Sequence, residues 1–351
     1  MTIYFYLSIF VSTLFVFIFL EKSKKKIDKN QIYIILALIF ILISSFRWKV
    51  GGDWETYLFT YNRSNLNLIT FNWSFIFEII NYFFSNLRTG IFGVNIFVSS
   101  IFFLALYRFG KYLKFDLIII LLVSFSVVYF NGIMGYVRQT LSLAFLILTI
   151  EFLLKNKKYY SLVFISLAIF THSSAVILIP IYLNKYYRNL NIMLLMVFLT
   201  FVSIILTYDR FVVAINEFVL KGTMSKGALF RSLPLLISCL IYILLRNKLF
   251  LNEKNLRFIN DYLCLISFLL VLLIYLSPLL SAIADRFAFY MVIFQLLVVG
   301  LVFKKIIKVS NKNYLHYGIF VSISYFIITF SWFIFGDYSI YWLNYNFMYF
   351  E

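Results

Sequence analysis

Residues 3–20 have the sequence IYFYLSIFVSTLFVFIFL, and residues 21–29 continue as EKSKKKIDK. A helix needs about 20 mainly apolar residues to cross the hydrocarbon core of a bilayer, so residues 3–20 are long enough for one crossing. The lysines follow the apolar run, whereas a cleaved signal peptide carries its positive charge before it. Because basic residues concentrate in cytoplasmic loops, this order predicts a retained helix with its N-terminus outside the cell.

The composition of the whole chain is that of a membrane protein. Of the 351 residues, 63% are hydrophobic and 22% aromatic, and the mean hydropathy is +0.95. Soluble domains are about 45–50% apolar, and one core cannot hide such an excess, so a soluble protein is excluded. Only 3 prolines and 12 glycines interrupt the chain, which favours long helices over a barrel. We expect an all-α, polytopic membrane bundle that forms one domain over residues 1–351.

Later apolar runs and the basic clusters between them set the expected number of crossings. The runs lie near residues 32–46, 91–107, 117–130, 139–154, 160–183, 191–207, 231–246, 259–276, 287–303 and 315–335. The orientation rule places the clusters near Lys111, Lys157, Lys185, Lys248 and Lys305 in the cytoplasm. Together these requirements predict about twelve crossings, with short re-entrant or half helices and both termini outside.

Two apolar segments fit this orientation only as short helices. If residues 73–87 crossed the membrane, the basic residues from Arg108 to Lys114 would lie outside, so we expect a re-entrant or surface-lying helix there. If residues 160–183 crossed once, Lys185 and every later cluster would be inverted. Two short helices at 160–171 and 173–184, with a turn at Thr171-His172-Ser173-Ser174, remove the conflict.

Several other functional classes have no support in the sequence. The net charge is +17, and the orientation rule explains most of it without nucleic acid. Cys239 and Cys264 lie in apolar runs, as small hydrophobic residues do, and no residue spacing indicates a metal site. The chain has neither a phosphate-binding loop of the G-x-x-x-x-G-K-[ST] type nor a G-x-S-x-G nucleophile elbow. We therefore expect no metal and no cofactor.

A few arginines on the predicted outer face remain unexplained by orientation. An arginine near the bilayer costs free energy unless it has a partner or a substrate. These arginines are Arg47 in the loop 47–72, Arg138 at the start of a helix, Arg210 in the outer segment 208–230, and Arg286.

Each of these positions also has a plainer explanation. Arg47 is typical of a residue that anchors a helix among lipid headgroups, and Arg286 of a local ion pair with Asp285. His172, at the tip of the predicted hairpin, is typical of a hydrogen-bonded packing residue. Arg138 has the strongest case for function, because an arginine at a helix N-terminus opposes the helix dipole unless an anion lies nearby. Such an arrangement is a good phosphate site.

Outer arginines with few acids and many aromatic residues predict a lipid-linked diphosphate that carries sugars. Arginine forks bind phosphate bidentately, and we expect Arg47, Arg138, Arg286 and Arg210 to do so here. A pair of glycines lets the backbone approach a ligand closely. Further substrate contacts are expected from Gly51, Gly52, Trp54, Tyr57, Tyr136, Gln139 and Tyr290.

The motifs around these residues resemble those of a known family. They are Phe46-Arg47-x-x-Val50-Gly51-x-Asp53-Trp54-x-x-Tyr57, then Arg138-Gln139-x-Leu141-x-Leu143-Ala144, then Leu167-Ala168-x-Phe170-x-His172-Ser173-Ser174-Ala175, and last Arg286-x-x-x-Tyr290. In order and spacing they resemble the EpsG/Wzy-type polysaccharide polymerases over nearly the whole chain. The sequence departs from that pattern at Trp54, where tyrosine is commoner, and in residues 338–350, an aromatic tail without the family's proline.

The resemblance implies a multi-pass protein of the bacterial inner membrane with its active site on the outer face. Such proteins extend O-antigen, capsule or exopolysaccharide chains. A glycan growing on undecaprenyl diphosphate is transferred to a fresh lipid-linked repeat unit, and the fold is similar to that of multi-helix membrane glycosyltransferases. A flippase and a chain-length regulator are the usual partners, together with the lipid bilayer, and nucleic acid is not among them.

The residues predict a metal-independent transfer that inverts the anomeric carbon. The arginines would stabilise the charge that develops on the leaving diphosphate. His172 and Asp53 are both candidate bases for the attacking hydroxyl, since a histidine and a desolvated carboxylate can each accept its proton. Two other functions stay open: a transporter or flippase of lipid-linked oligosaccharide, and an O-antigen ligase, which shares the chemistry but uses another acceptor.

Overall fold

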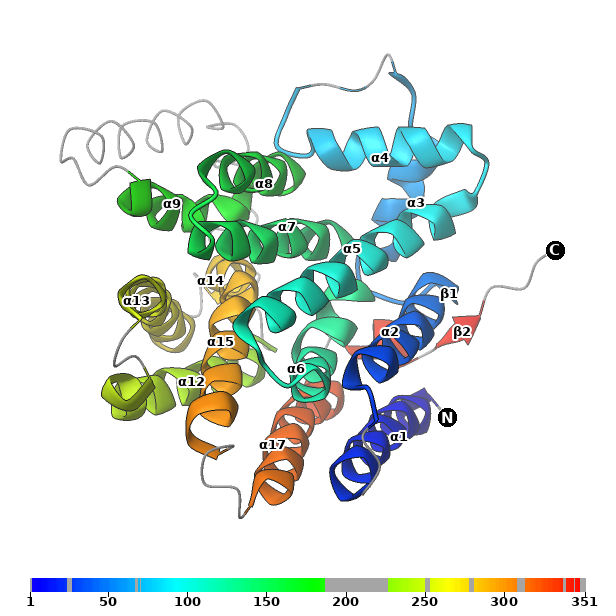
Figure 1. Cartoon of the computed structure of the whole chain (residues 1–351). Helices are drawn as coiled ribbons and strands as arrows, with labels where there is room; N and C mark the ends of the chain where they lie inside the picture. The colour runs from blue at the N-terminus through cyan, green and yellow to red at the C-terminus, as the bar shows by residue number, and fades with distance from the viewer. Residues whose placement is uncertain are drawn as a thin grey trace.

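A computed structural model describes residues 2–23, 27–66, 69, 71–186, 227–249, 253–277, 281–307, 313–336, 339–343 and 345–347. These residues form a bundle of helices and one pair of short strands (Figure 1). The first helices are α1 (Thr2–Lys22), α2 (Lys29–Ser45), α3 (Trp54–Asn62), α4 (Phe75–Asn86), α5 (Gly90–Leu113), α6 (Leu117–Ser124), the π-helical segment η2 (Phe125–Ile133) and α7 (Val137–Leu154).

The second half of the chain completes the bundle. Its helices are α8 (Lys158–Thr171), the 3₁₀ segment η3 (Ser173–Leu178), α9 (Ile179–Tyr186), α12 (Ala228–Leu249), α13 (Lys254–Leu276), α14 (Ser281–Ala288), the 3₁₀ segment η6 (Phe289–Met291), α15 (Val292–Val302), the π-helical segment η7 (Phe303–Ile307), α17 (Tyr314–Phe335) and α18 (Ile340–Leu343). The strands β1 (Arg47–Trp48) and β2 (Asn346–Phe347) pair antiparallel and join the loop after α2 to the C-terminal segment.

The expected all-α membrane bundle is confirmed, while the number of about twelve crossings stays a prediction. Among the described residues, seven helices are long and apolar enough to cross a membrane, and four shorter apolar helices accompany them. The predicted span 191–207 and residues 208–226 of the predicted outer segment lie outside the described residues.

The centre and the periphery of the bundle differ in what covers their apolar side chains. Helix α7 is hydrophobic on all sides, and its residues from Gln139 to Leu153 are all buried, mainly against α5 and α8. A helix of this kind requires protein around its whole circumference. The outer helices instead expose large apolar side chains, such as Phe15, Leu244 and Phe320. In a membrane protein these faces contact lipid tails, which are as apolar as the core.

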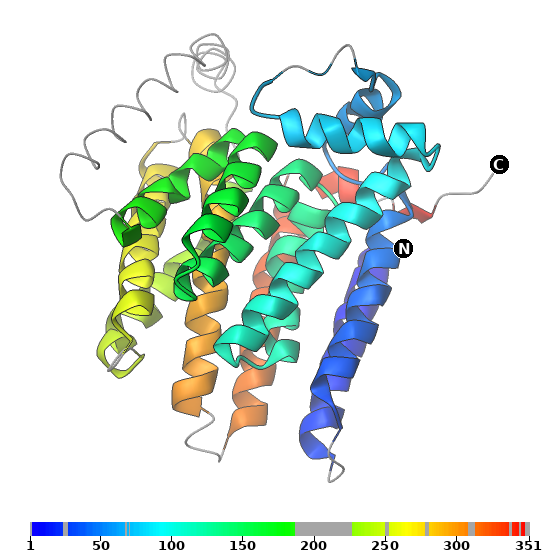
Figure 2. The ribbon, with the colours of Figure 1, turned by 45° about the horizontal axis from the view of Figure 1, so that its top comes forward.

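The two segments predicted to be short helices are short helices in the structure. Helix α4 has 12 residues and runs across the direction of the long helices (Figure 2). The apolar run 160–183 is divided at His172, which ends α8 and precedes η3, as the charge argument predicted. At that break the Nδ1 atom of His172 accepts a hydrogen bond from the backbone N–H of Ser174, so the histidine itself caps the second helix.

The described basic loops lie together at one end of the bundle (Figure 2). Lys29, after the first loop, donates a hydrogen bond to Asp116 at 2.6 Å, and Tyr314 donates to the same carboxylate at 2.8 Å. Lys305 forms an ion pair with Glu253 at 2.8 Å. These contacts join the loops that follow α1, α5, α12 and η7. The clusters in these four loops therefore share one side, as the orientation rule required, while Arg188 of the cluster near Lys185 lies outside the described residues.

Candidate functional site

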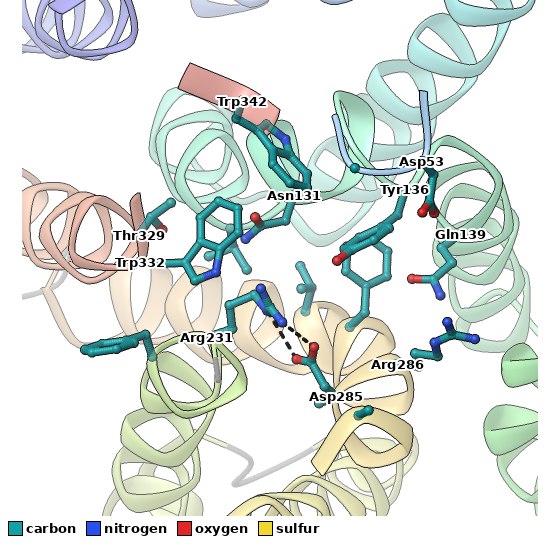
Figure 3. Close-up of a pocket in the computed structure, with 18 of the residues that line it drawn as sticks. Asp53, Asn131, Tyr136, Gln139, Arg231, Asp285, Arg286, Thr329, Trp332 and Trp342 are labelled. Carbon is teal, nitrogen blue, oxygen red and sulfur yellow. Dashed lines mark hydrogen bonds and ion pairs between the residues drawn. The ribbon is translucent and has the colours of Figure 1, made fainter. Parts of the chain in front are cut away.

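Most of the predicted site residues converge on one cavity at the end of the bundle opposite the basic loops. The cavity has a volume of about 400 Å³ and lies where α7, α12 and α14 begin and where η2 and α17 end (Figure 3). The predicted residues on its wall are Gly52, Asp53, Tyr57, Tyr136, Arg138, Gln139, His172 and Arg286.

The other predicted residues lie behind the cavity wall or outside the described part. Gly51, Trp54 and Tyr290 are buried and adjoin wall residues. Arg210 belongs to residues 187–226, which the structure does not describe.

Arg47 is buried beside the cavity and supports the loop that carries Asp53. Its side chain is 1% exposed, and its Nε donates to the carbonyl of Val50 at 3.3 Å. Its Nη1 donates to the carbonyl of Ser44, and the guanidinium lies 5.4 Å from the centre of the Trp54 ring. These contacts clamp the turn between α2 and α3. The expectation that Arg47 contacts the diphosphate directly is not supported by this position.

A tight turn at Gly51 and Gly52 directs Asp53 into the cavity. Gly51 has a φ of +105°, a conformation that other residues rarely adopt. A β-carbon at Gly51 would lie 2.1 Å from the carbonyl oxygen of Met134, whereas one at Gly52 would lie 3.3 Å from the nearest atom, on the ring of Trp342. Only the first position therefore requires glycine.

We expect Gly51→Ala to lower polymer formation by about 10²-fold, because a displaced turn moves Asp53, and a misplacement of about 1 Å in an active site can cost about 10²-fold in rate. The measurement is the length and amount of surface polysaccharide in cells whose own gene has been deleted. Gly52→Ala is the comparison variant: its added β-carbon meets only the ring of Trp342, at 3.3 Å, so it should lower polymer formation much less than Gly51→Ala. Equal loss in both variants would contradict the role assigned to this turn.

Arg138 and Arg286 make the part of the cavity wall near Asp53 positive. Arg138 is in the first turn of α7, and it lines the cavity together with Tyr57. The helix dipole adds positive potential at the same place. Within the described part of the chain, no carboxylate lies within 4 Å of the Arg138 guanidinium. Two arginines, a helix N-terminus and one acid, Asp53, leave an excess of positive charge that suits a phosphate group.

Asp53 presents its carboxylate to the cavity and not to the helix that it precedes. An aspartate before a helix usually accepts a hydrogen bond from the first turn, but the Asp53 side chain makes no such bond to α3. The hydroxyl of Tyr57 lies 3.5 Å from its Oδ2. Burial raises the pKa of Asp53 above its ordinary value of 3.8, and the nearby Arg286 and Arg138 oppose this rise. The carboxylate is therefore a stronger base than an exposed aspartate.

The contacts of His172 fix its ring in the neutral form, with the proton on Nε2. The backbone N–H of Ser174 can only donate, so Nδ1 of His172 is an acceptor and the proton of the neutral ring lies on Nε2. The hydroxyl of Tyr290 also lies 3.1 Å from Nδ1. Nε2 lies 3.3 Å from the side-chain amide of Gln139. Because Nε2 carries the proton, the amide must turn its oxygen toward the ring and its NH₂ group away. Burial, with Arg138 and Arg286, lowers the pKa of His172 to about 3.

Sequence reasoning missed a second group of wall residues. Asp285 forms an ion pair with Arg231, 54 positions away, through Nε and Nη2 of the arginine, a partner that the sequence did not suggest. Trp332 lies 5.4 Å from the Arg231 guanidinium and 5.2 Å from Trp342, edge to face. Asn131 and Gln295 also line the cavity. The sequence around these tryptophans and amides does not indicate a site, because such residues in apolar runs are usually packing residues.

Among the described residues, no three His, Cys, Asp or Glu side chains come together as metal ligands would. The family model described as EpsG family matches residues 30–347, a range that contains the whole described cavity wall. No curated protein and no solved structure matches the chain.

Proposed function

This chain belongs to the EpsG family, and from that premise we propose a polysaccharide polymerase of the bacterial inner membrane. It transfers a growing glycan from undecaprenyl diphosphate to a lipid-linked repeat unit at the outer face. The family assignment supports the polymerase class. The observation that carries the residue roles is the convergence of Arg138, Arg286 and Asp53 on one cavity.

The distribution of charge supports an outer-face site. The described basic loops share one end of the bundle, and the cavity lies at the other end. Because lysine and arginine concentrate on the cytoplasmic side, the cavity end faces outward. This is the side on which a lipid-linked repeat unit would meet the growing chain.

Arg138 and Arg286 bind the diphosphate of the donor in this proposal. The hydroxyl of the acceptor sugar attacks the anomeric carbon, a new C–O bond forms, and the bond to the diphosphate oxygen breaks. The electron pair of that bond leaves with undecaprenyl diphosphate. Positive groups already in place stabilise the developing charge without the cost of reorganising solvent. A single displacement inverts the anomeric centre.

Asp53 takes the proton of the attacking hydroxyl. Its carboxylate faces the cavity, and burial raises its pKa toward the range that suits a general base. The contacts of His172 favour a different role, because its Nδ1 atom is occupied by Ser174 and Tyr290. Through its Nε2 atom the neutral histidine orients Gln139, whose NH₂ group then faces the cavity as a donor to the substrate.

Reconstitution of the purified protein in lipid vesicles tests the proposal. The probe is the lipid-linked repeat unit extracted from cells that lack the polymerase gene. We expect longer chains and stoichiometric release of undecaprenyl diphosphate. Movement of the unit across the vesicle membrane without lengthening would identify a transporter, and transfer only to an added lipid A or protein acceptor would identify a ligase. Either result would overturn the polymerase assignment.

A further inference from the structure

We propose that the side of the cavity away from Arg138 and Arg286 binds an uncharged pyranose ring, held by the amides of Asn131 and Gln295. Figure 3 shows Asp53, Gln139 and Arg286 on one side of the cavity and Trp332, Trp342, Asn131 and Thr329 on the other. We name the second group, together with Gln295, the amide side. That this ring belongs to a glycan rests on the proposed function.

The amide side extends into the bundle below the arginines. Gln295 lies one turn further along α15 than Val292, and both line the cavity. Pro234 lies one turn after Arg231 in α12, whereas Val127 lies about one turn before Asn131 in η2. These three helices thus each contribute wall residues from two successive turns.

Asn131 and Gln295 are buried amides that lack protein partners. Asn131 is 4% exposed and Gln295 is 2% exposed, and neither Oδ1 of Asn131 nor Oε1 of Gln295 has a hydrogen-bond partner in the described part of the chain. An unpaired buried amide costs about 1–3 kcal/mol, so it requires an explanation. Asn260 is the informative contrast: its Oδ1 atom is also unpaired among the described residues, but its amide nitrogen donates to the carbonyl of Leu256 one turn earlier, and it does not line the cavity. The two cavity amides make no such bond to a described residue.

The surroundings favour an uncharged ligand. The two oxygens of Asp285 face the guanidinium of Arg231, so these charges compensate each other. The hydroxyl of Thr329 already donates to the carbonyl of Ser126 at 2.5 Å. What the amide side offers is therefore a pair of amide groups, which donate to and accept from hydroxyl or acetamido groups.

Aromatic rings give the amide side the shape for a sugar. Trp332 and Trp342 are each 1% exposed, so they form a rigid wall and not an open stacking face. The rings of Tyr136 and Phe289 are only half-buried and line the cavity, with 6.4 Å between their centres. The C–H face of a pyranose packs on such rings while its hydroxyls reach the amides. The wall combines aromatic and aliphatic side chains with many polar groups, the mixture that a ring with both C–H and hydroxyl groups requires.

Binding of two separate probes tests the proposal. The first probe is the repeat-unit oligosaccharide released from its lipid by mild acid, and the second is farnesyl diphosphate, a short prenyl diphosphate without sugar. We expect Gln295→Met and Asn131→Leu to weaken binding of the oligosaccharide about tenfold, the worth of one hydrogen bond, and to leave binding of farnesyl diphosphate unchanged. Asn260→Leu is the matched control and should change neither affinity.

Thermal stability separates recognition from a structural role. Because Met and Leu remove an unpaired buried amide, both variants should be as stable as the unmodified protein or more so. Unchanged oligosaccharide affinity in both variants, or an equal loss for farnesyl diphosphate, would overturn the amide side as a sugar site. Failure of the proposed function would give a different result. In the reconstituted vesicles the unmodified protein would not lengthen chains, whatever the oligosaccharide affinity of the variants.

The same variants identify which sugar occupies the amide side. In the reconstituted reaction, donor chains and single acceptor units are varied separately. A raised KM for the acceptor assigns the ring to the incoming repeat unit, and a raised KM for the donor assigns it to the growing chain. Either outcome supports the site, and no change in either KM contradicts it.

Discussion

Replacing Arg138 with alanine is expected to lower the rate of polymer formation by about 10²–10³-fold, the usual cost of losing one positioned charge donor. Arg138 lies at the N-terminus of α7, and its charge acts on both Asp53 and His172. In cells, the loss appears as the disappearance of long chains from an electrophoretic ladder of the polysaccharide. The amount of tagged protein in the membrane fraction should be unchanged, since Arg138 is only partly buried and supports no ion pair among the described residues.

Arg138→Lys should also fail, because lysine keeps the charge but lacks the planar fork that binds phosphate bidentately. Arg63→Ala is the control: Arg63 is an exposed arginine on the same end of the molecule, where its guanidinium lies 4.6 Å from the Phe59 ring. It should leave the ladder intact. A full-length ladder in Arg138→Ala cells would refute the assignment of this residue to the diphosphate.

The parts of the fold that the sequence predicted are those that depend on charge and apolar length. The break at His172 followed from the need to place the later basic clusters on one side, and no propensity argument was required. The short α4, which runs across the long helices, followed from the same rule. Both are consequences of the bilayer, which imposes one strong constraint on the whole chain. The convergence of Asp53 with Arg138 and Arg286 followed from the prediction that all three lie at helix ends on the same side of the bundle.

The parts that the sequence missed depend on which side chains meet. Asp285 is followed directly by Arg286, yet it pairs with Arg231, because adjacent residues of a helix point in different directions. Arg47 belongs to a conspicuous motif, but it is turned inward to backbone carbonyls. An arginine that holds a loop and one that holds a substrate look the same in a sequence.

The C-terminal segment contributes to the cavity wall, although its sequence departs from the family pattern. Residues 338–350 differ from the family pattern, but Trp342 lines the cavity and its Nε1 donates to the carbonyl of Phe130 at 2.8 Å. The hydroxyl of Tyr6 donates to the carbonyl of Trp342 at 3.0 Å, which ties this segment to the first helix. The cavity wall is therefore completed by contacts between the two ends of the chain, and no local pattern predicts such contacts.

Asp53→Asn is expected to lower the rate by about 10²–10⁴-fold, the contribution of a general base, while the donor still binds. Asparagine has nearly the same shape as aspartate but does not accept the proton of the attacking hydroxyl. Glu55→Gln, two positions later on the exposed face of α3, is the matched control and should be active. The measurement is the single-turnover rate in vesicles with saturating lipid-linked repeat unit.

The pH dependence and the stability of this variant separate catalysis from folding. Burial raises the pKa of Asp53 above 3.8, so activity should fall as the pH is lowered through that raised value, and the residual activity of Asp53→Asn should lack this limb. Protonation of His172 does not account for the limb if its midpoint lies above 3.8, because the pKa of His172 is about 3. A raised pKa also means that the ionised carboxylate destabilises the fold once the pH exceeds it. Asp53→Asn should therefore melt at the same or a higher temperature at neutral pH. An inactive variant that melts earlier would instead show that Asp53 holds the loop, and the base would have to be sought elsewhere in the cavity.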